Sequence, residues 1–172
     1  MAKALPKKPP KREDAVKADR QHSFDEPDLE VTSGVVDKPI KAILYGAGGV
    51  GKTTLASLLS KNGLRVRFVD VEESSDFVDA EKIHPRDWFE LRGYLRGNSI
   101  LEADVVVLDS LTRCVNYCTD FVVETIPHEK KEKTIQRLED YGWGKGVYHL
   151  HDCFLPLLSD LDSLVAKGKH VI

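Results

Sequence analysis

The sequence lacks the features that mark secreted and membrane-spanning proteins. Its 172 residues contain no apolar run near the roughly 18 residues that a membrane-spanning helix needs. The basic N-terminus is not followed by the apolar stretch of a secretory signal. Cysteine is scarce, because Cys114, Cys118 and Cys153 are too few for a disulfide framework. We therefore expect a protein of the reducing cytoplasm that has no contact with a membrane.

The sequence also has little net charge, at −3, so charge alone indicates no partner. Apolar residues make up 41% and charged residues 31%, which is ordinary for a soluble globular domain. The charge is nevertheless uneven along the chain. Residues 1–20 have an excess of Lys and Arg, whereas residues 21–40 have an excess of Asp and Glu.

The first 38 residues are rich in proline and charge and have few large apolar side chains. Such a stretch cannot bury enough surface to offset the entropy that it would lose on ordering. We expect residues 1–38 to be a disordered charged tail and residues 39–172 to form the folded domain. The basic half of the tail either contacts nucleic acid or an acidic partner, or is solvated, as runs of charge usually are.

Apolar runs alternate with helical patterns from residue 39 onward. Residues 41–45 are largely apolar and end at a glycine cluster, which predicts a buried strand followed by a tight turn. Leucines at helical spacing come next (Leu55, Leu58 and Leu59), with Gly63 as a helix cap, and residues 65–69 predict a second strand. This order predicts parallel strands with a right-handed crossover, and hence an α/β fold.

The glycine cluster fits the phosphate-loop pattern G-x-x-x-x-G-K-T. Its residues are Gly46, Ala47, Gly48, Gly49, Val50, Gly51, Lys52 and Thr53, followed by Thr54. Glycines allow backbone N–H groups to surround a phosphate, and the helix beginning at Lys52 directs its positive dipole at the same anion. Lys52 would contact the β- and γ-phosphates, and the Thr53 hydroxyl would bind Mg²⁺. The pattern predicts a site for ATP and Mg²⁺.

Two alternatives explain the same glycines differently. Gly46, Gly48 and Gly51 also match the dinucleotide fingerprint G-x-G-x-x-G, and Asp70 lies where an acid would bind a ribose. That interpretation leaves Lys52 and Thr53 without a role. The other alternative is a glycine-rich turn without a ligand, which would not need the entropic cost of so many glycines.

An apolar run that ends in Asp109 supplies the second part of the site. Residues 103–108 predict a buried parallel strand, and its C-terminal edge is where ligands bind in open α/β sheets. Asp109 would hold Mg²⁺ opposite Thr53. On its own this pattern is weak, but paired with the upstream phosphate loop it becomes specific.

Hydrolysis also needs a carboxylate that orients or deprotonates water. The residue after Asp109 is Ser110, so this acid must come from elsewhere. Asp70 and Glu72 share one face of the second strand by alternation, next to the phosphate site if this strand neighbours that of Asp109. We favour Glu72 as the catalytic base, with Glu73 and Asp70 as alternatives and a solvated acidic loop as the non-functional interpretation.

Four segments together resemble the phage- and prophage-type AAA ATPases with a RecA-like core, which are found beside single-strand-annealing recombination genes. They are residues 46–54, 68–72, 105–113 and 141–146 (Tyr-Gly-Trp-Gly-Lys-Gly). In RecA-like proteins the acid two residues beyond the strand-ending Asp activates water, and that position is Glu72 here. The resemblance implies a three-layer αβα fold, Mg-dependent ATPase activity, homo-oligomers, and partners among single-stranded DNA and recombination proteins.

Further segments give weaker signals. Residues 85–94 predict a helix with Trp88, Leu91 and Leu95 on its packing face, and residues 111–124 predict another. An apolar stripe from Val147 to Val165 predicts a long helix packed on the sheet. Residues 168–172 predict a last strand, and because RecA-like cores continue beyond such a strand, we expect a domain that is incomplete at its C-terminal end.

The charged residues 127–137 precede Trp143, Lys145 and Tyr148, which suggests a DNA-facing loop, since single strands bind to aromatics and cations. Alternatively, Lys145 reaches the nucleotide of a neighbouring subunit. Two other functions remain open for the whole chain. One is a small P-loop kinase, although the chain lacks the arginine-rich lid of such kinases, and the other is a nucleotide-gated interaction module without turnover.

Overall fold

A computed structural model describes residues 33–34, 38–128 and 134–172. The expected tail, residues 1–38, therefore lies almost entirely outside the described residues, as does the centre of the charged stretch 127–137. The chain divides into two units, Met1–Val36 and Asp37–Ile172, and the elements below all belong to the second. None of the helices in the described residues is long and apolar enough to cross a membrane.

A parallel four-stranded sheet organises the described part of the chain. Its strands are β1 (Val66–Asp70), β2 (Glu81–Ile83), β3 (Val105–Asp109) and β4 (His170–Val171), in the order β2-β1-β3-β4. The valine-rich runs of β1 and β3 pair along their full length, from Val66 opposite Val105 to Asp70 opposite Asp109. The predicted α/β class and parallel sheet are confirmed.

Side chains alternate strictly between the two faces of the central strands, as the pleat of a strand requires. Val66 and Phe68 of β1 pack in one apolar cluster with Ala56, whereas Val69 packs in the other. In β3, Val105 and Val107 belong to the first cluster and Val106 and Leu108 to the second. Both faces of the sheet are thus buried, which explains why β3 is a continuous apolar run from Val105 to Leu108 rather than an alternating one.

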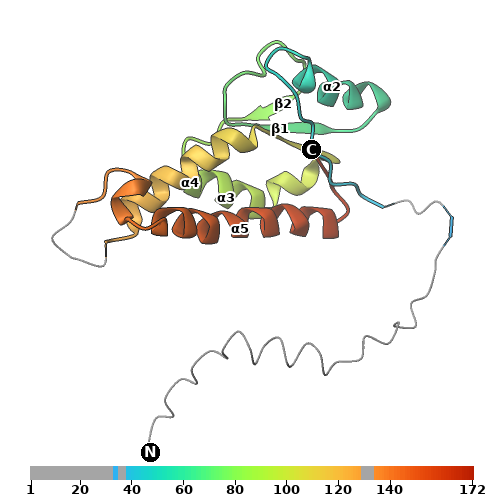
Figure 1. Cartoon of the computed structure of the whole chain (residues 1–172). Helices are drawn as coiled ribbons and strands as arrows, with labels where there is room; N and C mark the ends of the chain where they lie inside the picture. The colour runs from blue at the N-terminus through green and yellow to red at the C-terminus, as the bar shows by residue number, and fades with distance from the viewer. Residues whose placement is uncertain (1–32, 35–37, 129–133) are drawn as a thin grey trace, which may run out of the picture. The chain divides into compact units, whose positions relative to one another are not determined.

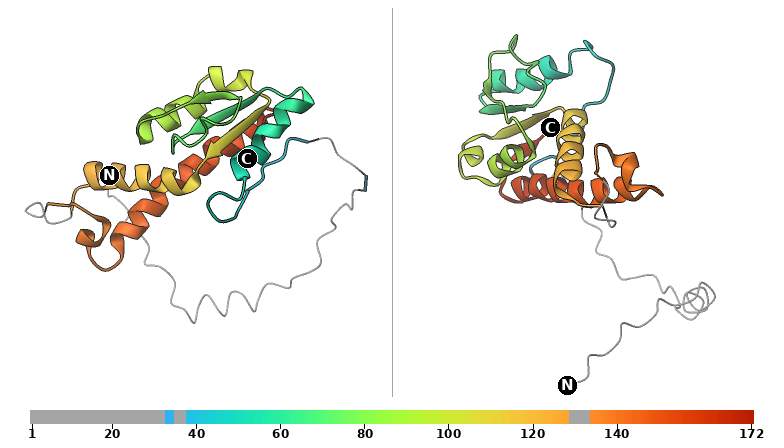
Figure 2. Two further views of the ribbon diagram at one scale, coloured as in Figure 1. Left: turned by 90° about the horizontal axis from the view of Figure 1, so that it is seen from above. Right: turned by 90° about the vertical axis from the view of Figure 1, so that its left-hand side faces the viewer.

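Helices cover both faces of this sheet and give three layers (Figure 1). One face carries α2 (Lys52–Ser57) with the 3-10 turn η1 (Leu58–Asn62). The other carries α3 (Trp88–Arg96), α4 (Leu111–Thr125) and α5 (Lys145–Ala166), and α4 and α5 pack against each other (Figure 2). Two further 3-10 turns, η2 (Ser99–Glu102) and η3 (Leu138–Tyr141), precede β3 and α5.

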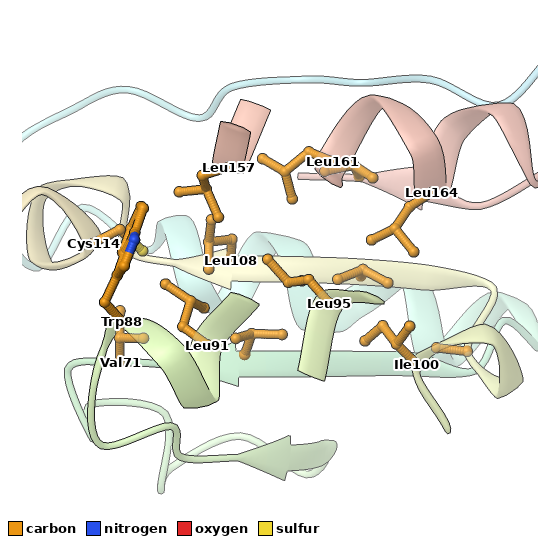
Figure 3. Close-up of a cluster of buried hydrophobic side chains, with 14 of the residues drawn as sticks. Val71, Trp88, Leu91, Leu95, Ile100, Leu108, Cys114, Leu157, Leu161 and Leu164 are labelled. Carbon is orange, nitrogen blue, oxygen red and sulfur yellow. The ribbon is translucent and has the colours of Figure 1, made fainter. Parts of the chain in front are cut away.

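Leucines and one tryptophan fill the core on the three-helix face. Leu157, Leu161 and Leu164 of α5 face the sheet and α3, whose buried side chains are Trp88, Leu91 and Leu95 (Figure 3). The packing face predicted for α3 is therefore confirmed. The helix begins at Trp88 rather than near Pro85, because the Asp87 carboxylate caps it by accepting a hydrogen bond from the Glu90 N–H at 2.8 Å.

The prediction of a buried strand over residues 41–45 is wrong in part. Lys41 forms an isolated parallel bridge with Val171, and only Ala42 and Leu44 turn inward. Ile43 is 77% exposed and Tyr45 is 99% exposed. This segment lies beyond β4 at the margin of the sheet, so one of its faces has no covering helix in the described part of the chain.

In α2 and α5, fewer apolar side chains are buried than the spacing of their leucines predicts. In the α2 region the buried side chain is Ala56, while Leu55 and Leu58 are exposed. On α5, Val147 and Leu158 are exposed as well, so the stripe meets the core mainly through the second half of the helix. Gly63, with φ of 81°, caps η1 as the sequence predicts, since a left-handed conformation favours glycine.

Candidate functional site

The hydroxyl of Thr53 donates a hydrogen bond to the carboxylate of Asp109, with Oγ1 and Oδ2 2.7 Å apart. Thr53 lies in the first turn of α2, directly after the glycine loop, and Asp109 is the last residue of β3. The pair is 56 residues apart in sequence. The two residues predicted to hold Mg²⁺ are thus side by side at the C-terminal edge of the parallel sheet.

The glycine loop is exposed and curls around the ammonium group of Lys52. Lys52 Nζ donates to the carbonyl oxygens of Gly46 and Ala47, each at 3.0 Å. Gly49 and Gly51 have φ of 76° and 94°, in the left-handed region that side chains with a Cβ rarely adopt. The sequence pattern is therefore matched by a backbone that needs glycine at these two positions, with the lysine held at the mouth of the loop.

Asp70 is fully buried and holds the turn that follows β1. Its carboxylate accepts hydrogen bonds from the N–H groups of Glu72, Ser74 and Ser75 and from the Ser75 hydroxyl. Burial acts to raise the pKa of Asp70, but these hydrogen bonds outweigh it, so the pKa lies below its usual value. Asp70 is directed into its own loop, which argues against Asp70 as the water-activating base and against the ribose contact of the dinucleotide alternative.

Glu72 lies beside the end of the Asp109 strand. The Val71 N–H donates to the Asp109 carbonyl at 2.8 Å, which extends the pairing of β1 and β3 by one residue. The Ser110 hydroxyl then donates to Glu72 Oε1. Glu73 follows in a left-handed conformation, with φ of 53°. Among the described residues, Glu72 is the one of the three acids whose carboxylate is hydrogen-bonded to Ser110, the residue after Asp109.

Ser110 is a site residue that the sequence interpretation missed. It is the N-cap of α4, and its Oγ accepts from the Arg113 N–H at 3.5 Å while donating to Glu72. A serine immediately before an apolar helical pattern is a standard helix-start signal, so its capping role was open to prediction. The bond of Ser110 to Glu72 could not be predicted from the sequence, because that contact depends on the pairing of β1 with β3.

The Tyr-Gly-Trp-Gly-Lys-Gly segment lies at the far end of α4 from Ser110. The Tyr141 hydroxyl donates to the carbonyl of Val122, in the last turn of α4, at 2.9 Å. Gly142, Trp143 and Gly144 all have positive φ, and Trp143 is 98% exposed. A 15-residue helix is about 22 Å long, so in this chain Lys145 is remote from the phosphate loop.

The three cysteines lie in or beside the apolar core of the three-helix face. Cys114 and Cys118 are buried, Cys153 is half-buried, and all three are free thiols. Burial is the main reason why the pKa values of Cys114 and Cys118 rise to about 12, which keeps both thiols neutral. In the described residues no group of three or more His, Cys, Asp and Glu side chains is arranged to hold a metal ion.

Comparison with known proteins gives one family. The model of a family described as an AAA domain matches residues 38–172, the whole of the folded unit that contains the glycine loop and the Asp109 strand. Neither the curated proteins nor the solved structures gave a significant match. The matched region covers most of the chain and includes the parallel sheet, the glycine loop and Asp109. The chain therefore belongs to the AAA domain family of nucleotide-binding P-loop proteins, which are generally ATPases.

Proposed function

We propose that this protein binds ATP with Mg²⁺ at residues 46–54 and hydrolyses it. The observation that carries the proposal is the 2.7 Å hydrogen bond between Thr53 and Asp109 beside the glycine loop. Both residues are half-buried and lie outside the two apolar clusters of the core. A hydroxyl and a carboxylate held together there offer the hard oxygen ligands that Mg²⁺ prefers.

Each residue has a separate task in this mechanism. Lys52 would exchange its bonds to the Gly46 and Ala47 carbonyls for phosphate oxygens. Thr53 and Asp109 would hold the metal ion, directly or through its water shell. When bound, Mg²⁺ would neutralise charge on the phosphates. Glu72, two residues beyond β1 and bonded to Ser110, would orient the attacking water and accept its proton.

The test is ATP turnover measured as phosphate release, with matched variants. We expect turnover in the parent protein and its loss in Lys52→Ala, while Lys61→Ala, an exposed lysine of η1, keeps the parent rate. Phosphate transferred to an added nucleotide or metabolite instead of water would indicate the kinase alternative. Nucleotide binding without turnover would indicate the interaction module, and either result would contradict hydrolysis.

We further propose that turnover serves single-stranded DNA in phage recombination, in the cytoplasm of a bacterial or phage-infected cell, with other recombination proteins and as a homo-oligomer. This rests on the four-segment resemblance, with support from the fully exposed Trp143, whose indole is free to stack on a base. Trp143 has a left-handed backbone between two glycines and is 98% exposed.

DNA binding is testable by the anisotropy of a labelled single strand. We expect Trp143→Ala to weaken binding by about tenfold, because stacking contributes about 1–3 kcal/mol per base. Phe77→Ala, which removes another exposed aromatic ring, is the control and should leave affinity unchanged. Equal affinities for the parent protein and the Trp143 variant would contradict a stacking role.

A further inference from the structure

The Ser110 hydroxyl connects Glu72 to the first turn of α4. Its oxygen accepts the N–H of Arg113, and its single proton is donated to Glu72 Oε1. A serine hydroxyl has one proton to donate, so with an N–H already directed at its oxygen the proton points at the carboxylate. The bond therefore fixes one oxygen of Glu72 relative to α4 and to the end of β3.

The backbone on either side of this bond is also held. The Glu72 N–H donates to the carboxylate of Asp70 at 3.2 Å. The Val71 N–H bond to the Asp109 carbonyl holds the backbone of the two strand ends together. The main chain at Glu72 is thus fixed by backbone hydrogen bonds, and its carboxylate is held by the Ser110 hydroxyl.

Without the bond to Ser110, the Glu72 side chain could rotate freely, because it is exposed and has three rotatable bonds. A carboxylate that must orient water gains from being held in one rotamer, since displacement by about 1 Å can cost 100-fold in rate. We infer that Ser110 is a positioning residue. Its hydroxyl holds the Glu72 carboxylate next to Asp109, where the carboxylate can orient the water that attacks ATP. This inference rests on the proposed ATPase function and adds a residue to it.

The first experiment compares Ser110→Ala and Ser110→Thr in the full chain. Loss of the hydroxyl in Ser110→Ala should lower kcat about tenfold and leave the KM for ATP and the affinity for a non-hydrolysable ATP analogue unchanged. Ser110→Thr keeps a hydroxyl at the same position and should restore most of kcat. An unchanged kcat in Ser110→Ala, or a Ser110→Thr protein as slow as the alanine variant, would overturn the inference.

A second variant separates positioning from helix capping. Glycine is nearly as good an N-cap as serine, so Ser110→Gly should unfold at the parent temperature while losing kcat as Ser110→Ala does. A Ser110→Gly protein with the parent kcat would overturn the inference. So would a loss of ATP affinity that matches the loss of kcat, because that would show a structural role.

The double variant gives the sharpest test. If Ser110 acts through Glu72, Ser110→Ala should have no further effect on the residual rate of Glu72→Gln. A further tenfold loss of the residual rate in the double variant would contradict action through Glu72. Failure of the proposed function and failure of this inference give different results. If the parent protein does not turn over ATP, both are overturned. If the parent protein is active and Ser110→Ala keeps the parent kcat, only the inference is overturned.

Discussion

Asp70 and Asp109 lie directly opposite each other at the ends of two paired parallel strands, yet their carboxylates are turned to different partners. Asp70 is buried and bonded to the turn that follows it, whereas Asp109 is half-exposed and bonded to Thr53. Asp70 therefore shapes the loop that presents Glu72, and Asp109 belongs to the proposed metal site. Two acids at the same register position thus have different partners, and only Asp109 is a proposed metal ligand.

Replacing Asp70 by Asn should destabilise the fold by about 2 kcal/mol, because hydrogen bonds to a charged acceptor are worth about 1.5–3 kcal/mol each and an amide cannot accept all of them. Urea unfolding at pH 7 measures this. Asp79→Asn, at an exposed position nine residues along, is the control and should change stability little.

The same residue predicts a pH dependence. Since the pKa of Asp70 is lower in the folded protein than in the unfolded chain, its contribution is fully present above the unfolded value of about 4. It is lost as the pH falls through the lower, folded value. We expect the stability difference between the parent and Asp70→Asn to shrink below about pH 4, and a difference that stays constant to pH 2 would contradict this.

Thr53→Val should remove the dependence of nucleotide binding on Mg²⁺. Valine keeps the shape of threonine but cannot bind a metal ion or donate to Asp109. We expect the affinity for ATP to fall roughly 10- to 100-fold with Mg²⁺ present, and little in excess EDTA, as measured by titration calorimetry. Thr119→Val, on the exposed side of α4, should bind as the parent does. An equal loss with and without Mg²⁺ would indicate damage to the loop instead.

Gly146→Ala and Gly93→Ala should change stability in opposite directions. A Cβ on Gly146 would lie 2.2 Å from the Leu138 carbonyl oxygen, so α5 or η3 would have to shift, at a cost of about 1–3 kcal/mol. A Cβ on Gly93, inside α3, meets nothing within 4 Å, and alanine there should add about 0.5–1 kcal/mol. Thermal unfolding of the two variants provides the comparison, and equal melting temperatures would contradict it.

Two aspartates of α5 should differ in their importance. Asp160 is buried and accepts from Arg92 at 2.7 Å and from Arg96 at 2.8 Å, so Asp160→Ala should cost about 3 kcal/mol by leaving the Arg92 side chain, which is only 18% exposed, without its carboxylate. Asp162 pairs with Lys41 at an exposed position, and Asp162→Ala should cost at most about 1 kcal/mol. Chemical denaturation distinguishes the two, and similar losses would contradict this ranking.

Local patterns predicted the sheet and the glycine loop because they depend on residues close in sequence. The apolar side chains of β1 and β3 pack on both faces of the sheet, and the loop needs glycine for its own backbone. The exposure of Ile43 and Tyr45 at the margin of the sheet could not be predicted in this way, because it depends on whether another element covers them. The bond of Ser110 to Glu72 likewise follows from strand register, which no single segment contains.

The two tryptophans provide the protein with a pair of intrinsic optical reporters. Trp88 is buried against Phe154, with ring centroids 6.0 Å apart, and Trp143 is surrounded by water. Indole emission shifts to longer wavelength with hydration, so the blue edge of the spectrum follows the core and the red edge follows the loop before α5. A single unlabelled sample can therefore distinguish an event at the exposed ring from unfolding of the three-helix face.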